Sequence, residues 1–175
     1  MRLALSIVGA GVLVMYAGAG IASAQSPAPP ACTAAEHRQF DFWLGEWNVT
    51  VPNGNAAGVN RITSINGGCA LREEWTGARG FTGTSINAYD ASSGRWHQTW
   101  IGSDGVLLLL DGAFRDGTME LAGVTVGRNG AKTHQRIRWT PLGGSPARLR
   151  QLWETSTDGG KTWAVAFDGT YQRRQ

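Results

Sequence analysis

Residues 95–114 read RWHQTWIGSDGVLLLLDGAF. Side chains at every second position of a strand share one face, so Trp96, Gln98 and Trp100 point to the same side. Asp104-Gly105 supplies the residue types that a tight turn needs, and a second apolar run follows the turn. The stretch therefore predicts two antiparallel strands joined by a short hairpin.

The same alternation of β-branched or aromatic segments with turn residues continues over the rest of the chain from Glu46. We expect ten strands, at 46–51, 59–65, 70–76, 81–89, 95–102, 106–114, 118–126, 132–140, 147–155 and 163–173. Short links between them favour an all-β, up-and-down antiparallel sheet. Closure into a barrel removes the two exposed edges of such a sheet, so a closed barrel is preferred to an open sandwich.

A short helix is expected in front of the first strand. Thr33 followed by Glu36 matches a capping box, in which each side chain bonds a free backbone N–H of the first turn. Phe40 and Trp43 supply its apolar face, and Gly45 ends it.

The first two dozen residues have the pattern of a secretory signal peptide. Arg2 precedes an apolar run from Leu3 to Ile21, and Ala22-Ser23-Ala24 forms a small-residue cleavage site. The alternative is an uncleaved membrane anchor, because the run approaches the ~20 residues that span a bilayer. We expect a signal peptide at 1–24, a Pro/Ala-rich tether at 25–32, and a barrel domain at 33–175. The mature protein would then be periplasmic or secreted by a bacterium, with no membrane span.

Cys32 and Cys69 are the two cysteines of the chain. An oxidising compartment permits them to form a disulfide, which would tie the N-terminal segment to an early strand. The alternative is two separate buried thiols.

Charge and histidine spacing argue against several partners. The formal net charge is +3, and lysine and arginine are scattered without the clustered patch that nucleic acids require. His37, His97 and His134 lack the close spacing of zinc motifs. We therefore expect no nucleic-acid partner, no metal and no cofactor.

The tryptophan-bearing faces of the strands are the candidate interior. Aromatic and amide side chains share these faces, a combination that suits a cavity with a few fixed polar groups. The predicted ligand-binding residues are Glu73, Trp75, Asn87, Trp96, Gln98, Trp100, Gln151, Trp153 and Phe167. The alternative is that the tryptophans fill the barrel. A cavity is preferred because ten strands enclose more volume than the eight that side chains can just fill. Its ligand would be small and apolar or amphipathic.

Two other functions stay open. Glu73 is the acidic residue on a tryptophan-bearing face, and burial would raise its pKa, so it is a candidate general acid or base working with Asn87 or Tyr89. Alternatively the barrel is solid and its outer face binds an envelope partner. Arg136 and Arg138 alternate on one strand, as Arg148 and Arg150 do on a neighbouring one, which indicates either a solvated outer face or an anion site.

Residues 40–47, FDFWLGEW, contain the Gly-x-Trp entry to the first strand of lipocalins and related barrels. The resemblance implies that Trp47 plugs the base of the barrel and stacks with a basic residue of the last strand, Arg173 or Arg174. With Gly-Cys-x-Leu-x-Glu-Glu-Trp at 68–75, Asn-x-Tyr-Asp at 87–90 and Gly-Arg-Trp-x-Gln-x-Trp at 94–100, the chain resembles a bacterial lipocalin-like family usually labelled a domain of unknown function. The family implies a fold and no established substrate.

Two further resemblances are narrower. Nitrobindin, a similar ten-stranded barrel, binds haem through a histidine near its C-terminus, but no histidine follows His134 here. Residues 156–163, STDGGKTW, are similar to the Asp-box hairpin of sialidase propellers. One copy in a chain of this length indicates a turn-stabilising device and not a propeller.

Overall fold

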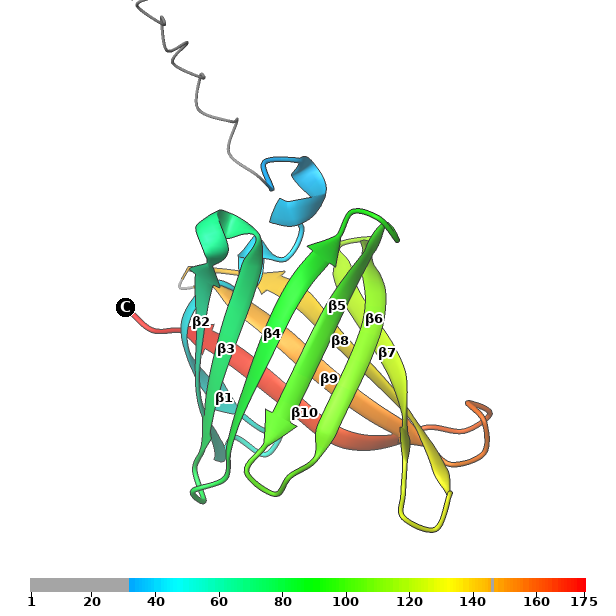
Figure 1. The fold of residues 1–175 in the computed structure, drawn as a ribbon. Coiled ribbons are helices and arrows are strands. Elements are labelled where there is room, and N and C mark those ends of the chain that lie inside the picture. The colour runs from blue at the N-terminus through cyan, green and yellow to red at the C-terminus, as the bar shows by residue number, and fades with distance from the viewer. Residues whose placement is uncertain (1–31, 146) are drawn as a thin grey trace, which may run out of the picture.

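The computed structural model describes residues 32–145 and 147–175 (Figure 1). The expected signal peptide and all but the last residue of the expected tether lie outside the described residues. In the described part of the chain, no helix has the length and apolar character needed to cross a membrane.

Ten antiparallel strands form a closed barrel in which each strand pairs with its neighbours in sequence and β1 pairs with β10 (Figure 1). The strands are β1 Gly45–Thr50, β2 Ala56–Ile65, β3 Ala70–Gly77, β4 Thr82–Asp90, β5 Arg95–Gly102, β6 Leu107–Arg115, β7 Thr118–Val126, β8 Lys132–Gly143, β9 Arg148–Ser156 and β10 Ala164–Arg173. The all-β up-and-down barrel is confirmed, and the open sandwich is excluded.

A cluster around Trp47 secures the seam between β1 and β10. Trp47 lies opposite Arg173, whose guanidinium carbon is 4.8 Å from the centre of the indole ring. The Trp47 indole N–H donates to the Trp43 carbonyl at 2.8 Å, and Arg173 donates to the Leu44 carbonyl at 2.6 Å. A Cβ at Gly45 would come within 2.8 Å of the guanidinium, so a glycine is required there. The contact expected from the Gly-x-Trp motif is therefore present.

The N-terminal segment closes one end of the barrel (Figure 1). The expected short helix is present there as two 3-10 helices, η1 Ala35–Arg38 and η2 Asp41–Trp43. The predicted capping box is wrong, because the turn begins after Ala34 and no side chain caps it. Packing holds the segment instead: Phe40 and Trp43 are fully buried and stack with ring centres 4.8 Å apart.

Burial confirms that the tryptophan-bearing faces of β3, β5 and β9 point inward. At the start of β10 the prediction that the tryptophan-bearing face points inward is wrong. A register shift between Val165 and Phe167 reverses the alternation, which leaves Val165 exposed while Phe167 still faces inward. Trp163 lies outside the barrel, where its ring packs 4.1 Å from the guanidinium of Arg136.

The hairpin between β9 and β10 is organised by Asp158. Its carboxylate accepts hydrogen bonds from the backbone N–H groups of Lys161 and Thr162, each at 2.9 Å, and from the hydroxyls of Ser156 and Thr162. These bonds, those from Thr162 first, hold the pKa of Asp158 well below its usual range. The Asp-box sequence thus serves as a turn device.

Cys32 and Cys69 form the predicted disulfide, with Cα atoms 5.1 Å apart. The bond fastens the start of the described chain to the residue after the 3-10 turn η3 Asn66–Gly68, immediately before β3. It therefore anchors the segment that closes the barrel.

Replacing both cysteines with serine should lower the free energy of unfolding by about 3 to 4 kcal/mol, because the unfolded chain regains the freedom of the loop that the bond closes. Denaturant titration of the variant beside the wild type measures the difference. Equal unfolding midpoints would contradict a stabilising role for the bond.

Candidate functional site

The barrel encloses a cavity of about 470 Å³ at the end opposite the N-terminal segment. Its mouth is formed by the loops that join β1 to β2 and β3 to β4, including Asn53, Asn55, Arg79 and Phe81. Its floor includes Trp139, which packs on Phe40 and Trp43 with ring centres 5.3 Å away in each case. One end is therefore sealed by aromatic packing, and the other is bounded by polar loops.

Aromatic rings form much of the wall: Trp75, Trp100, Trp153 and Phe167. Close packing against glycine holds two of them in place. A Cβ at Gly83 would lie 2.1 Å from the Trp100 ring, and one at Gly169 would lie 2.5 Å from the Phe167 ring. Any larger residue at these positions would displace the ring.

Glu73 is the acidic group of the cavity, and its side chain is almost fully buried. Asn60 donates to Oε1 at 2.7 Å and Ser85 donates to Oε2 at 2.6 Å, so each carboxylate oxygen has a fixed partner. Burial disfavours the charged form and raises the pKa of Glu73 from 4.5 to about 7, although both hydrogen bonds oppose the shift. The group thus changes charge near neutral pH.

Neutral polar side chains extend this site to both sides. The Gln98 side-chain amide donates to Oδ1 of Asn87 at 2.8 Å, and the Asn87 side-chain amide donates to the Ser85 hydroxyl at 2.8 Å. The N–H groups thus form a chain directed at the carboxylate. On the other side the Tyr171 hydroxyl donates to Gln151. Burial, and then the charge of Glu73, raise the pKa of Tyr171 well above its usual value, so its hydroxyl keeps its proton.

Of the nine predicted ligand-binding residues, seven line the cavity: Glu73, Trp75, Gln98, Trp100, Gln151, Trp153 and Phe167. The other two are buried elsewhere. Asn87 lies behind Ser85 and is fully buried, and Trp96 lies at the sealed end, where its indole donates to Gln39 at 3.1 Å and its ring meets Phe40. A residue that shares a strand face with lining residues therefore need not line the cavity itself, because part of each inward face lies at the sealed end.

Sequence reasoning missed several parts of the site. Ile137 and Trp139 line the cavity from β8, and their alternation with Arg136 and Arg138 was a usable signal. Asn60, which holds Glu73, lies on β2 among residues that give no comparable signal. Phe81 lies in a loop at the mouth, where strand alternation does not apply.

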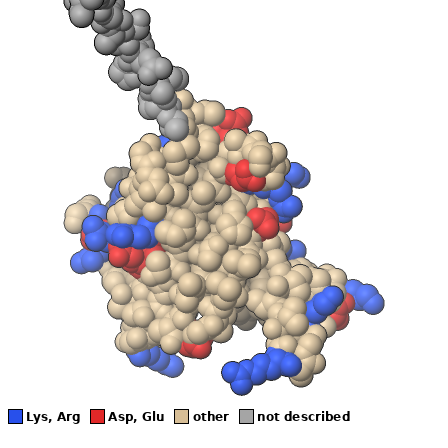
Figure 2. Space-filling view, in the orientation of Figure 1, with Lys and Arg blue, Asp and Glu red and all other residues tan. Residues whose placement is uncertain are grey.

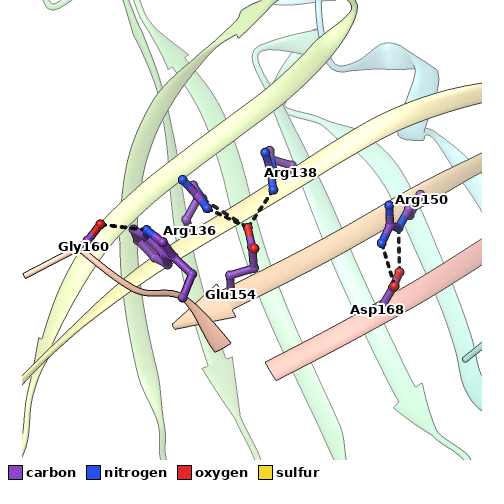
Figure 3. Close-up of polar contacts among 7 residues, drawn as sticks. Arg136, Arg138, Arg150, Glu154, Gly160 and Asp168 are labelled. Carbon is purple, nitrogen blue, oxygen red and sulfur yellow. Dashed lines mark hydrogen bonds and ion pairs between the residues drawn. The ribbon is translucent and has the colours of Figure 1, made fainter. Parts of the chain in front are cut away.

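Arginines of the outer face are paired with acidic side chains (Figure 3), and they are not among the residues that line the cavity. Arg136 and Arg138 both bind Oε2 of Glu154, at 3.0 and 2.7 Å. Arg150 binds both oxygens of Asp168 at 2.7 Å, and this contact lowers the pKa of that carboxyl. Three of the four arginines in the predicted stripe are therefore paired with acids across the strands, which favours the solvated face over an anion site.

A different part of the outer wall is apolar. The face formed by β4, β5 and β6 shows few charged side chains (Figure 2). Ile86, Ile101, Leu107 and Leu109 on these strands are all at least two-fifths exposed. The residues lie on the opposite strand faces from those that line the cavity.

Within residues 32–145 and 147–175, no group of three or more His, Cys, Asp or Glu side chains is placed to hold a metal ion. Comparison of the chain with protein-family models found no matching family, and a search of curated proteins found no match.

The pKa of Glu73 gives a sign for the pH dependence of stability. Between pH 4.5 and 7 the folded protein keeps a proton that the unfolded chain releases, so stability is highest below this range and falls as the pH rises through it. The loss from this group should reach up to about 3 kcal/mol. Glu73→Gln should remove it.

Urea unfolding at pH 5 and pH 8 measures the effect in the wild type, in Glu73→Gln and in a control, Glu74→Gln. Glu74 lies outside the barrel and pairs with Arg72 at 3.3 Å, so the control should keep the wild-type difference. The same pH difference in Glu73→Gln as in the wild type would show that Glu73 titrates normally.

Proposed function

We propose that this protein is an exported, lipocalin-like barrel that binds a small, largely apolar ligand. The observation that most directly supports this proposal is the cavity of about 470 Å³, which has an aromatic wall and one buried acid. Ligand sites of roughly 300 to 1,000 Å³ that combine apolar walls with a few polar groups are typical of small-molecule binding proteins.

The cavity argues against the alternative of a solid barrel. A packed interior leaves few voids larger than a water molecule, because unfilled space loses dispersion contacts. Here Trp75 and Phe167 pack edge to face with their ring centres 6.0 Å apart, and both rings border the unfilled volume of the cavity. The exposed apolar face over β4, β5 and β6 is the observation that favours the interaction module instead.

Export and family membership rest on separate observations. The signal-peptide pattern at 1–24 predicts secretion, and the Cys32–Cys69 bond is of the kind that persists in oxidising compartments. The contact of Trp47 with Arg173 supports the lipocalin-like relationship. We therefore place the mature protein in the periplasm or outside the cell.

Filling the cavity tests the proposal. Ala57 lines the cavity, so Ala57→Trp should occupy it and weaken binding of a neutral apolar fluorophore, N-phenyl-1-naphthylamine, at least tenfold. Ala122 is exposed on β7 outside the barrel, and Ala122→Trp adds the same side chain without touching the cavity. Fluorescence titration compares the two variants with the wild type, and circular dichroism checks that each is folded.

Equal binding by both variants and the wild type would place the fluorophore outside the cavity and contradict the proposal. Failure of the wild type to bind any neutral apolar probe would contradict it as well.

A second candidate is an enzyme that uses Glu73, and the pKa of about 7 favours it because general acids and bases work best near the operating pH. The structure does not bring the two expected partners, Asn87 and Tyr89, into direct contact with Glu73. Asn87 reaches Glu73 only through Ser85, while Tyr89 packs against His37 and Trp96.

For this enzyme, Glu73→Gln should reduce turnover of a cavity-bound substrate by at least about 100-fold, because the proton-transfer group is lost. Binding of the neutral fluorophore should barely change. Turnover assays on the variant beside Glu74→Gln measure this, and retained activity in Glu73→Gln would exclude Glu73 as the acid or base.

A further inference from the structure

We propose that the ligand of the cavity is a cationic amphiphile: an apolar body carrying an amine or ammonium group, which binds with its positive charge against Glu73. This inference rests on the proposed binding function and specifies the chemistry of the ligand.

The charges of the cavity favour a cation at its inner end. Among the described residues that line it, Glu73 and Arg79 are the charged ones. Glu73 is 4% exposed, whereas Arg79 lies in the exposed loop between β3 and β4 at the mouth. A ligand carboxylate entering the cavity would meet a buried acid, and like charges at close range repel strongly in such surroundings.

The carboxylate is held ready to accept further hydrogen bonds. Asn60 and Ser85 each donate one bond, one to each oxygen. An ionised carboxylate has about four acceptor positions, so about half of them stay available. An ammonium group, with its several N–H donors, supplies the complementary partners.

Within the described ranges 32–145 and 147–175, no basic side chain is placed as a counter-ion to Glu73. Asn60 from β2 and Ser85 from β4 bond Glu73 directly. Asn87 from β4, Gln98 from β5 and Tyr171 from β10 extend this network through those two residues. All are neutral, and Tyr171 keeps its proton. A bound cation would supply the missing charge and lower the raised pKa of Glu73.

The aromatic wall adds a second attraction for a cation. The faces of tryptophan and phenylalanine rings carry negative potential and attract ammonium groups within about 6 Å. Trp75, Trp100, Trp153 and Phe167 bound the same cavity as Glu73. Rings together with one acid are therefore suited to an amine that carries an apolar chain.

Three ligands with the same chain and different head groups test the inference: decylamine, 1-decanol and decanoate, each below its micelle concentration. Calorimetric titration at pH 8 should show decylamine binding at least tenfold more tightly than 1-decanol, with decanoate the weakest. An alkylamine, like lysine, stays charged up to about pH 10, so its own titration does not interfere.

Lowering the pH to 5 should weaken decylamine binding by up to about 100-fold. Protonated Glu73 does not attract the cation, and the fraction of protein molecules with an ionised Glu73 falls. Binding of 1-decanol should stay nearly constant. Glu73→Gln should bind the amine and the alcohol equally at pH 8, whereas the outer-face control Glu74→Gln should keep the preference.

The wild-type ranking alone decides the inference if Glu73→Gln does not fold. If 1-decanol or decanoate binds the wild type as tightly as decylamine, the proposed preference for a cationic head group is wrong, while the proposed binding of apolar ligands in the cavity stands. If none of the three binds, both the inference and the proposed function are overturned.

Discussion

The pairing of β1 with β10 is the constraint on which the rest of the structure depends. Without it the sheet would have two free edges, and its inner face would be open to water. Trp47 and Arg173 lie opposite each other on this seam and contact residues of the segment that seals one end. Closure thus separates the interior of the barrel from solvent, and ten strands make this interior too wide for side chains to fill completely. The cavity and the burial of Glu73 both follow from that width.

Much of this fold could be predicted from alternation and turn chemistry. The expected strands agree with the observed ones to within about three residues at their ends, because Gly, Asn and Asp turns punctuate the chain clearly. The inward faces of β3, β5 and β9 followed from tryptophan at every second position. The disulfide required only an oxidising compartment and two cysteines, although their proximity could not be known beforehand.

The remaining features depend on three-dimensional packing. Alternation predicts which face a residue occupies but not how far along the barrel it lies, so Trp96 and Trp100 could not be separated into the sealed end and the cavity. A bulge in β10 displaced Trp163, and bulges leave little trace in sequence. The partners of Glu73 come from β2 and β4, and their approach follows from strand register. The expected N-terminal helix is present as two 3-10 helices, but without the predicted cap, and its ring packing on the barrel could not be predicted from the local sequence.

The central claim is that the cavity is a ligand site in the native protein. Native mass spectrometry of the mature protein, purified without detergent from the cells that make it, tests this claim most directly when a denatured sample is run alongside. We expect a reproducible extra mass on the folded protein that disappears on denaturation, because a ligand enclosed by the barrel travels with the fold. A bare polypeptide mass in both samples would contradict the account.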